Sequence, residues 1–134
     1  MKLTTFLIIN AIIAVVFGLG FVLFPGQVTS LYGPEASAPL EYVGQLFGAA
    51  LLAFAALTWF ARNAPDSEAR RAILLALFVG DSVGFVVALI GQLGGVMNAL
   101  GWSTVAIYLL LAIGFYYFRF VAKPEATDVE RAVM

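Results

Sequence analysis

The sequence predicts an all-α fold, an integral membrane four-helix bundle that forms a single domain over residues 1–134. The composition is the first reason, because 63% of the 134 residues are hydrophobic, 11% are charged and the mean hydropathy is +1.01. Such values lie outside the range of soluble domains. The second reason is that four apolar stretches reach the length of about 20 residues that crosses a hydrocarbon core of about 30 Å. The stretches cover approximately residues 3–24, 42–61, 72–93 and 102–122.

The first stretch has one feature of a signal peptide, because Lys2 precedes an apolar run. The run is about 22 residues long, however, which exceeds the apolar region of a signal peptide. It ends at Phe24-Pro25-Gly26 without a small-residue cleavage site. We therefore expect a retained transmembrane helix.

Charged residues are distributed unevenly among the connections. The loop 25–41 carries Glu35 and Glu41 but no Lys or Arg, and the connection 94–101 carries no charge. All seven basic residues fall on the other side of the four stretches. Because loops rich in Lys and Arg stay in the cytoplasm, both termini, including the tail 123–134, are expected to be cytoplasmic. The basic residues are Lys2, Arg62, Arg70, Arg71, Arg119, Lys123 and Arg131.

The connections themselves contain ordinary turn and cap signals. The segment 25–34, bracketed by Pro and Gly, has room for one turn of interfacial helix. Asp66 or Ser67 is a candidate cap for the third long helix. The connection around Asn98 is glycine-rich and predicts a tight hairpin, and Thr127 could begin a short helix in the tail.

Small residues four positions apart mark the faces through which membrane helices pack closely. The third stretch has Gly80, Gly84 and Ala88 at this spacing, and the second has Gly44 and Gly48. Close packing within one bundle is sufficient to explain this pattern. Contact between subunits is the alternative, and the sequence leaves it open.

Asp81 is the only fully charged side chain deep inside an apolar stretch. A charge at that depth costs about 2.5 to 3.5 kcal/mol on insertion scales. Helical rise places Asn10, Asp81 and Tyr108 in one layer, roughly 12 to 16 Å from the basic ends. We expect a polar network in which Asp81 is hydrogen-bonded to Tyr108, to Asn10 or to both, with Ser82 a less favoured member. A second polar layer toward the outer surface would join Gln45 and Gln92.

Two roles for Asp81 follow from its surroundings. No Lys or Arg lies at its depth, and hydrocarbon disfavours the charged form, so a neutral carboxylic acid that locks the bundle by hydrogen bonds is one role. A carboxyl that gains and loses a proton, or holds a cationic ligand, is the other. Small proton-coupled exporters also have four spans and a buried carboxylate, but their balanced charge is unlike the one-sided basic residues found here.

The composition also excludes several classes of chemistry. The chain has no Cys and no His, so thiolate or imidazole ligation of metals and clusters is excluded, as is a Cys nucleophile or an imidazole base. No paired carboxylates, nucleophile with a base, or phosphate-binding loop are found. A basic patch with interleaved aromatic residues is missing as well. We therefore expect no enzymatic activity, no metal, no cofactor and no nucleic-acid partner.

Several short motifs resemble known families. They are Asn10 in the first stretch, the segment from Phe24-Pro25 to Leu31-Tyr32-Gly33, the run Gly44-Gln45-Leu46-Phe47-Gly48 and a polar residue in the third stretch. Over about residues 3–122 the chain looks like small uncharacterised bacterial four-helix membrane proteins. It is also distantly similar to Erg28-like scaffold proteins and DoxX-like proteins. The resemblance implies a bundle without catalysis and, for the Erg28-like case, a tether for membrane enzymes.

Two functional hypotheses follow from the sequence. The first is an accessory, assembly or scaffold subunit that binds other membrane proteins, itself or lipids. The second is a proton-linked transporter or channel centred on Asp81. An Asp81→Asn substitution separates them, because it removes titration while preserving shape.

Overall fold

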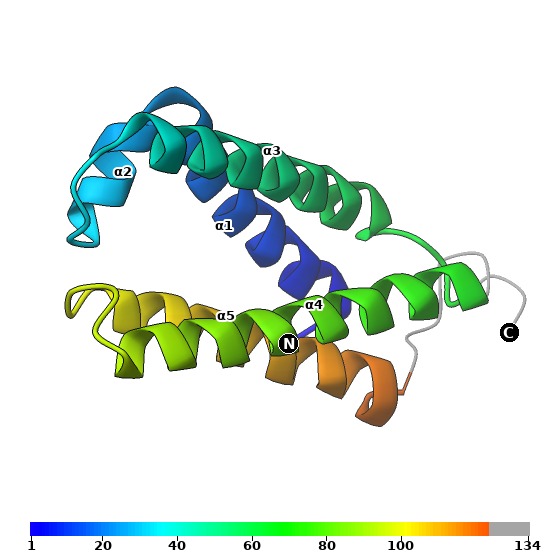
Figure 1. Cartoon of the computed structure of the whole chain (residues 1–134). Coiled ribbons are helices and arrows are strands. Elements are labelled where there is room, and N and C mark those ends of the chain that lie inside the picture. The colour runs from blue at the N-terminus through cyan, green and yellow to red at the C-terminus, as the bar shows by residue number, and fades with distance from the viewer. Residues whose placement is uncertain (124–134) are drawn as a thin grey trace, which may run out of the picture.

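The structure, a computed structural model, describes residues 1–123, so the helix predicted from Thr127 lies outside the described residues. Every regular element within this part is helical (Figure 1). The elements are α1 (Leu3–Leu23), α2 (Pro25–Leu31), α3 (Ala38–Ala61), α4 (Glu68–Leu93), α5 (Gly101–Tyr116) and the π-helical turn η1 (Tyr117–Val121), which continues α5.

Four helices are long and apolar enough to cross a membrane, which indicates a membrane protein. They are α1, α3, α4 and the continuous segment Gly101–Val121. The four predicted stretches therefore match the long helices, and the segment 25–34 contains the short helix α2, as expected.

Two long helices begin earlier than hydropathy alone predicts, because a serine caps each of them. The backbone N–H of Leu40 donates to Ser37 Oγ over 3.3 Å, and α3 begins at Ala38 instead of residue 42. The backbone N–H of Arg70 donates to Ser67 Oγ over 3.2 Å, and α4 begins at Glu68. Of the two candidate caps for the third long helix, the structure uses Ser67. These caps satisfy N–H groups that a helix start leaves unpaired.

The long helices pair as two hairpins. Helix α1 lies along α3, and α4 lies along α5 (Figure 1). Near the start of α1 the hairpins share an apolar core, in which the ring centroid of Phe6 lies 4.8 Å from that of Phe115 and 5.3 Å from that of Phe118. The buried members of this core are Phe6, Leu7, Ala61, Leu74, Leu77 and Phe115.

A second junction joins the hairpins at their other end. Asn98, in the connection between α4 and α5, donates from its side-chain amide to the Leu31 carbonyl over 2.9 Å. Its backbone N–H donates to the Tyr32 carbonyl over 2.8 Å. Gly33 has φ of 109°, a left-handed conformation that glycine adopts easily, and it lies against Asn98. The tight hairpin predicted around Asn98 is thus confirmed, and this asparagine also ties it to α2.

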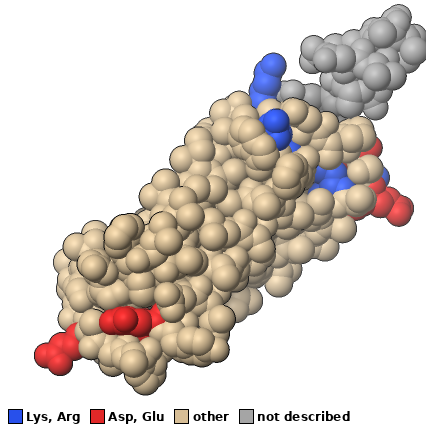
Figure 2. Space-filling view, turned by 90° about the horizontal axis from the view of Figure 1, so that it is seen from above, with Lys and Arg blue, Asp and Glu red and all other residues tan. Residues whose placement is uncertain are grey.

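Charged side chains lie at the two ends of the molecule (Figure 2). We call the end that holds the α3–α4 connection and the start of α1 the basic end, and the opposite end the α2 end. Glu35 and Glu41 lie at the α2 end, close to α2 and the start of α3. The described basic residues at the basic end are Lys2, Arg62, Arg70, Arg71, Arg119 and Lys123.

Candidate functional site

Asp81 and Tyr108 lie on the two helices of the α4–α5 hairpin, and both side chains are half-buried. The Tyr108 ring packs against Gly84, one turn further along α4 than Asp81. A Cβ at Gly84 would collide with the ring atoms Cδ1 and Cε1. The structure therefore places the Tyr108 ring against α4, one turn from Asp81.

Hydrogen bonds within this network are not formed. Asn10 is buried on α1, with 6% of its surface exposed. Among residues 1–123, no side-chain hydrogen bond includes Asn10, Asp81 or Tyr108. Asp81 also takes part in neither of the ion pairs of this part of the chain. The hydrogen bonds that were predicted to lock the bundle are therefore not present between these side chains. Instead, Tyr108 contacts Gly84, and the Asp81 carboxyl has no hydrogen-bond partner within residues 1–123.

The predicted outer polar layer is also corrected. The Gln45 amide donates to the Val22 carbonyl of α1 over 3.1 Å. The Gln92 amide donates to the Asn98 carbonyl over 2.9 Å. Each glutamine therefore bonds to a backbone carbonyl in its own hairpin and does not bridge the two.

Most of the small residues predicted to pack do so within the chain. A Cβ at Gly48 would lie 2.8 Å from the Gly18 carbonyl oxygen, and one at Gly44 would lie 3.4 Å from the Phe21 ring. Gly84 holds Tyr108, as described above, and Ala88 is half-buried. In α1 and α3 the small residues thus allow the close backbone approach that stabilises helix pairs in lipid.

Gly80 is the exception among these small residues. It is exposed, and a Cβ built on it meets nothing within 4 Å. The buried residues of α4 are Leu74 and Leu77, both near the basic end. In the most apolar window of α4 only 11% of residues are buried, against 33% for α1. We call the exposed residues Ala76, Gly80, Val83 and Val87 the bare face of α4.

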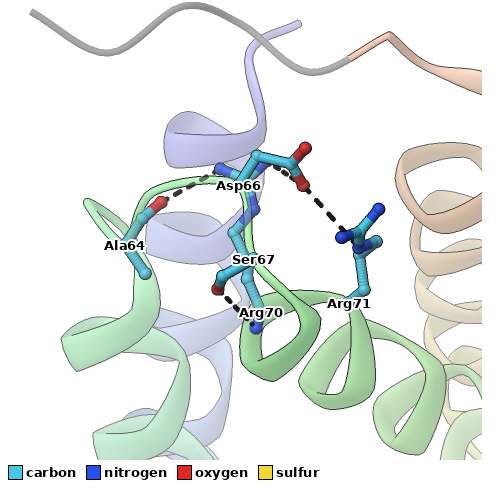
Figure 3. Close-up of polar contacts among 5 residues, drawn as sticks. All are labelled: Ala64, Asp66, Ser67, Arg70 and Arg71. Atoms are coloured by element: carbon cyan, nitrogen blue, oxygen red, sulfur yellow. Dashed lines mark hydrogen bonds and ion pairs between the residues drawn. The ribbon is translucent and has the colours of Figure 1, made fainter. Parts of the chain in front are cut away.

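The α3–α4 connection forms a polar clamp that sequence reasoning missed (Figure 3). The Arg70 guanidinium donates to the Ala64 carbonyl over 3.0 Å and lies 3.4 Å from an oxygen of Asp66. Arg71 lies 4.0 Å from the same oxygen. The spacing of Asp66 and Arg70, four positions apart, is the signal that could have identified the pair.

No three acidic side chains gather within residues 1–123 in a group that could hold a metal ion. The polar groups of the predicted site residues are a half-buried carboxyl, a phenol and several amides. Such groups can exchange a proton or bond to a partner.

A comparison with protein-family models matches residues 1–121 to a family described as a domain of unknown function, DUF8292. No curated protein matches the chain. No solved structure matches it either.

Proposed function

The chain belongs to the DUF8292 family, and we propose that it is a membrane protein without catalytic activity, an accessory or scaffold subunit that binds other membrane proteins. Its four long helices span the bilayer, and the bare face of α4 is the binding surface. The resemblance to Erg28-like proteins, which implies a tether, supports this proposal.

The observation that carries the proposal is that α4 contains a carboxyl group but buries few of its residues. This helix holds Asp81, yet it has the smallest share of buried residues among the four long helices. Next to Asp81, Gly80 presents backbone with no neighbour from the described part of the chain. Lipid offers polar groups no hydrogen-bond partners, whereas a second protein offers both partners and close packing against glycine. A partner helix on this face would cover the bare backbone at Gly80.

The proposal includes an orientation with both termini in the cytoplasm, across a bacterial inner membrane. The basic end supports it, because the Lys and Arg residues of the described chain gather there. A membrane-impermeant thiol reagent tests it on single-cysteine variants, since the chain has no Cys of its own. In intact cells, Ser30→Cys on α2 should react, and Asn63→Cys in the α3–α4 connection should react only after the membrane is opened. The reverse pattern would contradict the orientation.

Site-directed photo-crosslinking in native membranes tests the binding surface. A photoreactive amino acid at Val83, on the bare face, should give a defined protein adduct. The same group at Val16, an exposed position of α1, should give lipid adducts only. Lipid adducts alone from both positions would contradict the proposal, and an adduct of twice the chain mass would identify a second copy as the partner.

A second candidate function, proton-linked transport, is favoured by the unbonded state of the Asp81 carboxyl within residues 1–123. A carboxyl without fixed partners is free to exchange a proton. In vesicles that contain the purified protein and a pH-sensitive dye, transport requires proton flux that Asp81→Asn abolishes while the helical circular dichroism is unchanged. Equal flux in vesicles with wild-type protein, the variant and no protein would rule this function out.

A further inference from the structure

An apolar groove runs along the outside of the α1–α3 hairpin. Its volume is about 420 Å³, within the range of small-ligand sites. Its walls are apolar side chains of two helices, apart from the indole N–H of Trp59. Along α3 the lining extends from Phe60 to Leu52, roughly 12 Å at the helical rise, which is a substantial part of one bilayer leaflet. The lining includes Ala11, Val15, Leu52, Ala56, Trp59 and Phe60.

A cation lies at one end of this groove. The Cζ atom of Arg62 lies 3.8 Å from the centroid of the Trp59 ring, and Trp59 lines the groove. Two hydrogen bonds fix the position of Arg62. Its guanidinium donates to the Trp59 carbonyl over 2.6 Å, and Thr4 of α1 donates to the Arg62 carbonyl over 2.8 Å. The guanidinium is thus held beside the groove and at the basic end.

Arg62 also differs from its neighbours in charge pairing. Asp66 is engaged by Arg70 and Arg71, whereas no ion pair within residues 1–123 includes Arg62. A guanidinium retains several N–H donors after one hydrogen bond, and it binds phosphate well in a fixed geometry. The groove therefore has apolar walls and a group that can bind phosphate, the Arg62 guanidinium, at one end.

We propose that this groove binds an anionic phospholipid, with an acyl chain along Ala56 and Leu52 and the phosphate at Arg62. The surface that it uses lies on α1 and α3, away from the bare face of α4. This inference rests on the membrane location within the proposed function but needs no protein partner. A test in pure lipid vesicles can therefore fail or succeed independently of the scaffold function.

Quenching of Trp59 fluorescence by brominated lipid tests the site. The chain has two tryptophans, and a Trp102→Phe background leaves Trp59 as the only reporter. The protein is placed in phosphatidylcholine vesicles with increasing fractions of dibrominated phosphatidylglycerol or dibrominated phosphatidylcholine. The anionic lipid should quench at about fivefold lower mole fraction, the preference that one basic group near the surface provides.

Matched variants separate this site from general attraction to charge. Arg62→Lys should retain the preference for the anionic lipid, and Arg62→Gln should abolish it. Arg71→Gln removes a charge at the same end of the molecule and should leave the preference unchanged. Equal quenching by the two lipids, or an equal loss of preference in Arg62→Gln and Arg71→Gln, would overturn the proposal.

A second pair of variants tests the groove itself. Ala56→Phe fills it and should lower quenching by both lipids. Ala53→Phe adds the same ring at an exposed position of α3 outside the groove lining, and it should leave quenching unchanged. If both variants behave alike, Trp59 reports only bulk lipid, and the groove site is excluded.

Discussion

The two hairpins of this protein use glycine in different ways. In the α1–α3 hairpin, Gly18 and Gly48 face each other, and the backbones approach so closely that a Cβ at Gly48 would meet the Gly18 carbonyl oxygen at 2.8 Å. In the α4–α5 hairpin, Gly84 instead packs against the Tyr108 ring. No group of the described chain packs against Gly80. The first hairpin is closed on itself, whereas the second leaves one face of α4 available.

This difference is the basis for the binding surface proposed on α4. The α1–α3 hairpin holds its glycines in contact and its glutamine in a hydrogen bond. The α4–α5 hairpin carries Asp81 and Gly80, a glycine whose Cβ position has nothing within 4 Å. In lipid, polar groups and bare backbone gain most from contact with protein. A surface for association is therefore expected on α4.

Gly48→Val should produce the largest loss of stability. The added carbon atoms have no space between the Gly18 carbonyl and the side chains of Phe21 and Val22, so the α1–α3 hairpin must open. Overpacking of this kind costs about 1–3 kcal/mol, and contact with backbone places this variant at the upper end. Thermal unfolding in detergent, followed by circular dichroism, measures the effect. A melting temperature equal to that of the wild type would refute the close approach of these helices.

Gly84→Ala should be less damaging, because the clash is with a side chain that can rotate. We expect a loss of about 1–2 kcal/mol. Tyr108→Ala in the same chain removes the obstacle, so the double variant should lose less than the sum of the single variants. A double-mutant cycle on unfolding free energies measures this coupling. Strict additivity would show that Tyr108 does not rest on Gly84.

Arg70→Ala should have an effect of about 1 kcal/mol, because it removes a hydrogen bond to Ala64 and an ion pair with Asp66 at a partly buried position. The same unfolding assay measures it. Arg62→Ala is the comparison, since no ion pair of the described chain includes Arg62 and its guanidinium contacts only the nearby Trp59, at its carbonyl and its ring. Equal losses in the two variants would contradict a special role of the clamp.

Asp81→Asn should change the stability of the isolated protein by less than about 0.5 kcal/mol. No hydrogen bond or ion pair within residues 1–123 depends on this carboxyl. The unfolding free energy in detergent is the readout. A loss above about 2 kcal/mol would mean that Asp81 locks the bundle, as the sequence alone had suggested.

Hydropathy and helical length were sufficient to predict the four long helices, because each contains an apolar run of about 20 residues. The cap at Ser67 was one of the two predicted candidates. The cap at Ser37, which starts α3 at Ala38, was not predicted, because a count of apolar residues does not include a cap. The spacing alone predicted packing at Gly44 and Gly48, of which Gly48 makes the tight contact. Spacing could not reveal that Gly80 has no partner in this chain, since a glycine pattern does not identify which helix lies opposite.

The polar layers were harder to predict for a related reason. Depth along a helix placed Gln45 and Gln92 at similar heights, but it carried no information on how the hairpins are arranged. Each amide found a nearby carbonyl, at Val22 and Asn98. Similarly, depth placed Asp81 with Tyr108, whereas the contact that positions the ring is with Gly84. Local backbone acceptors thus outcompeted the distant side chains that a layer argument pairs.

The central claim is that the bare face of α4 binds another membrane protein, and gentle purification tests it most directly. Tagged wild-type protein and the variants Gly80→Val and Val16→Phe would be extracted from native membranes in mild detergent, and the accompanying proteins quantified by mass spectrometry. We predict a companion in near-stoichiometric amount with wild type and Val16→Phe, lost in Gly80→Val although that variant melts at the wild-type temperature. A companion retained equally by all three proteins, or none with any, would contradict the claim.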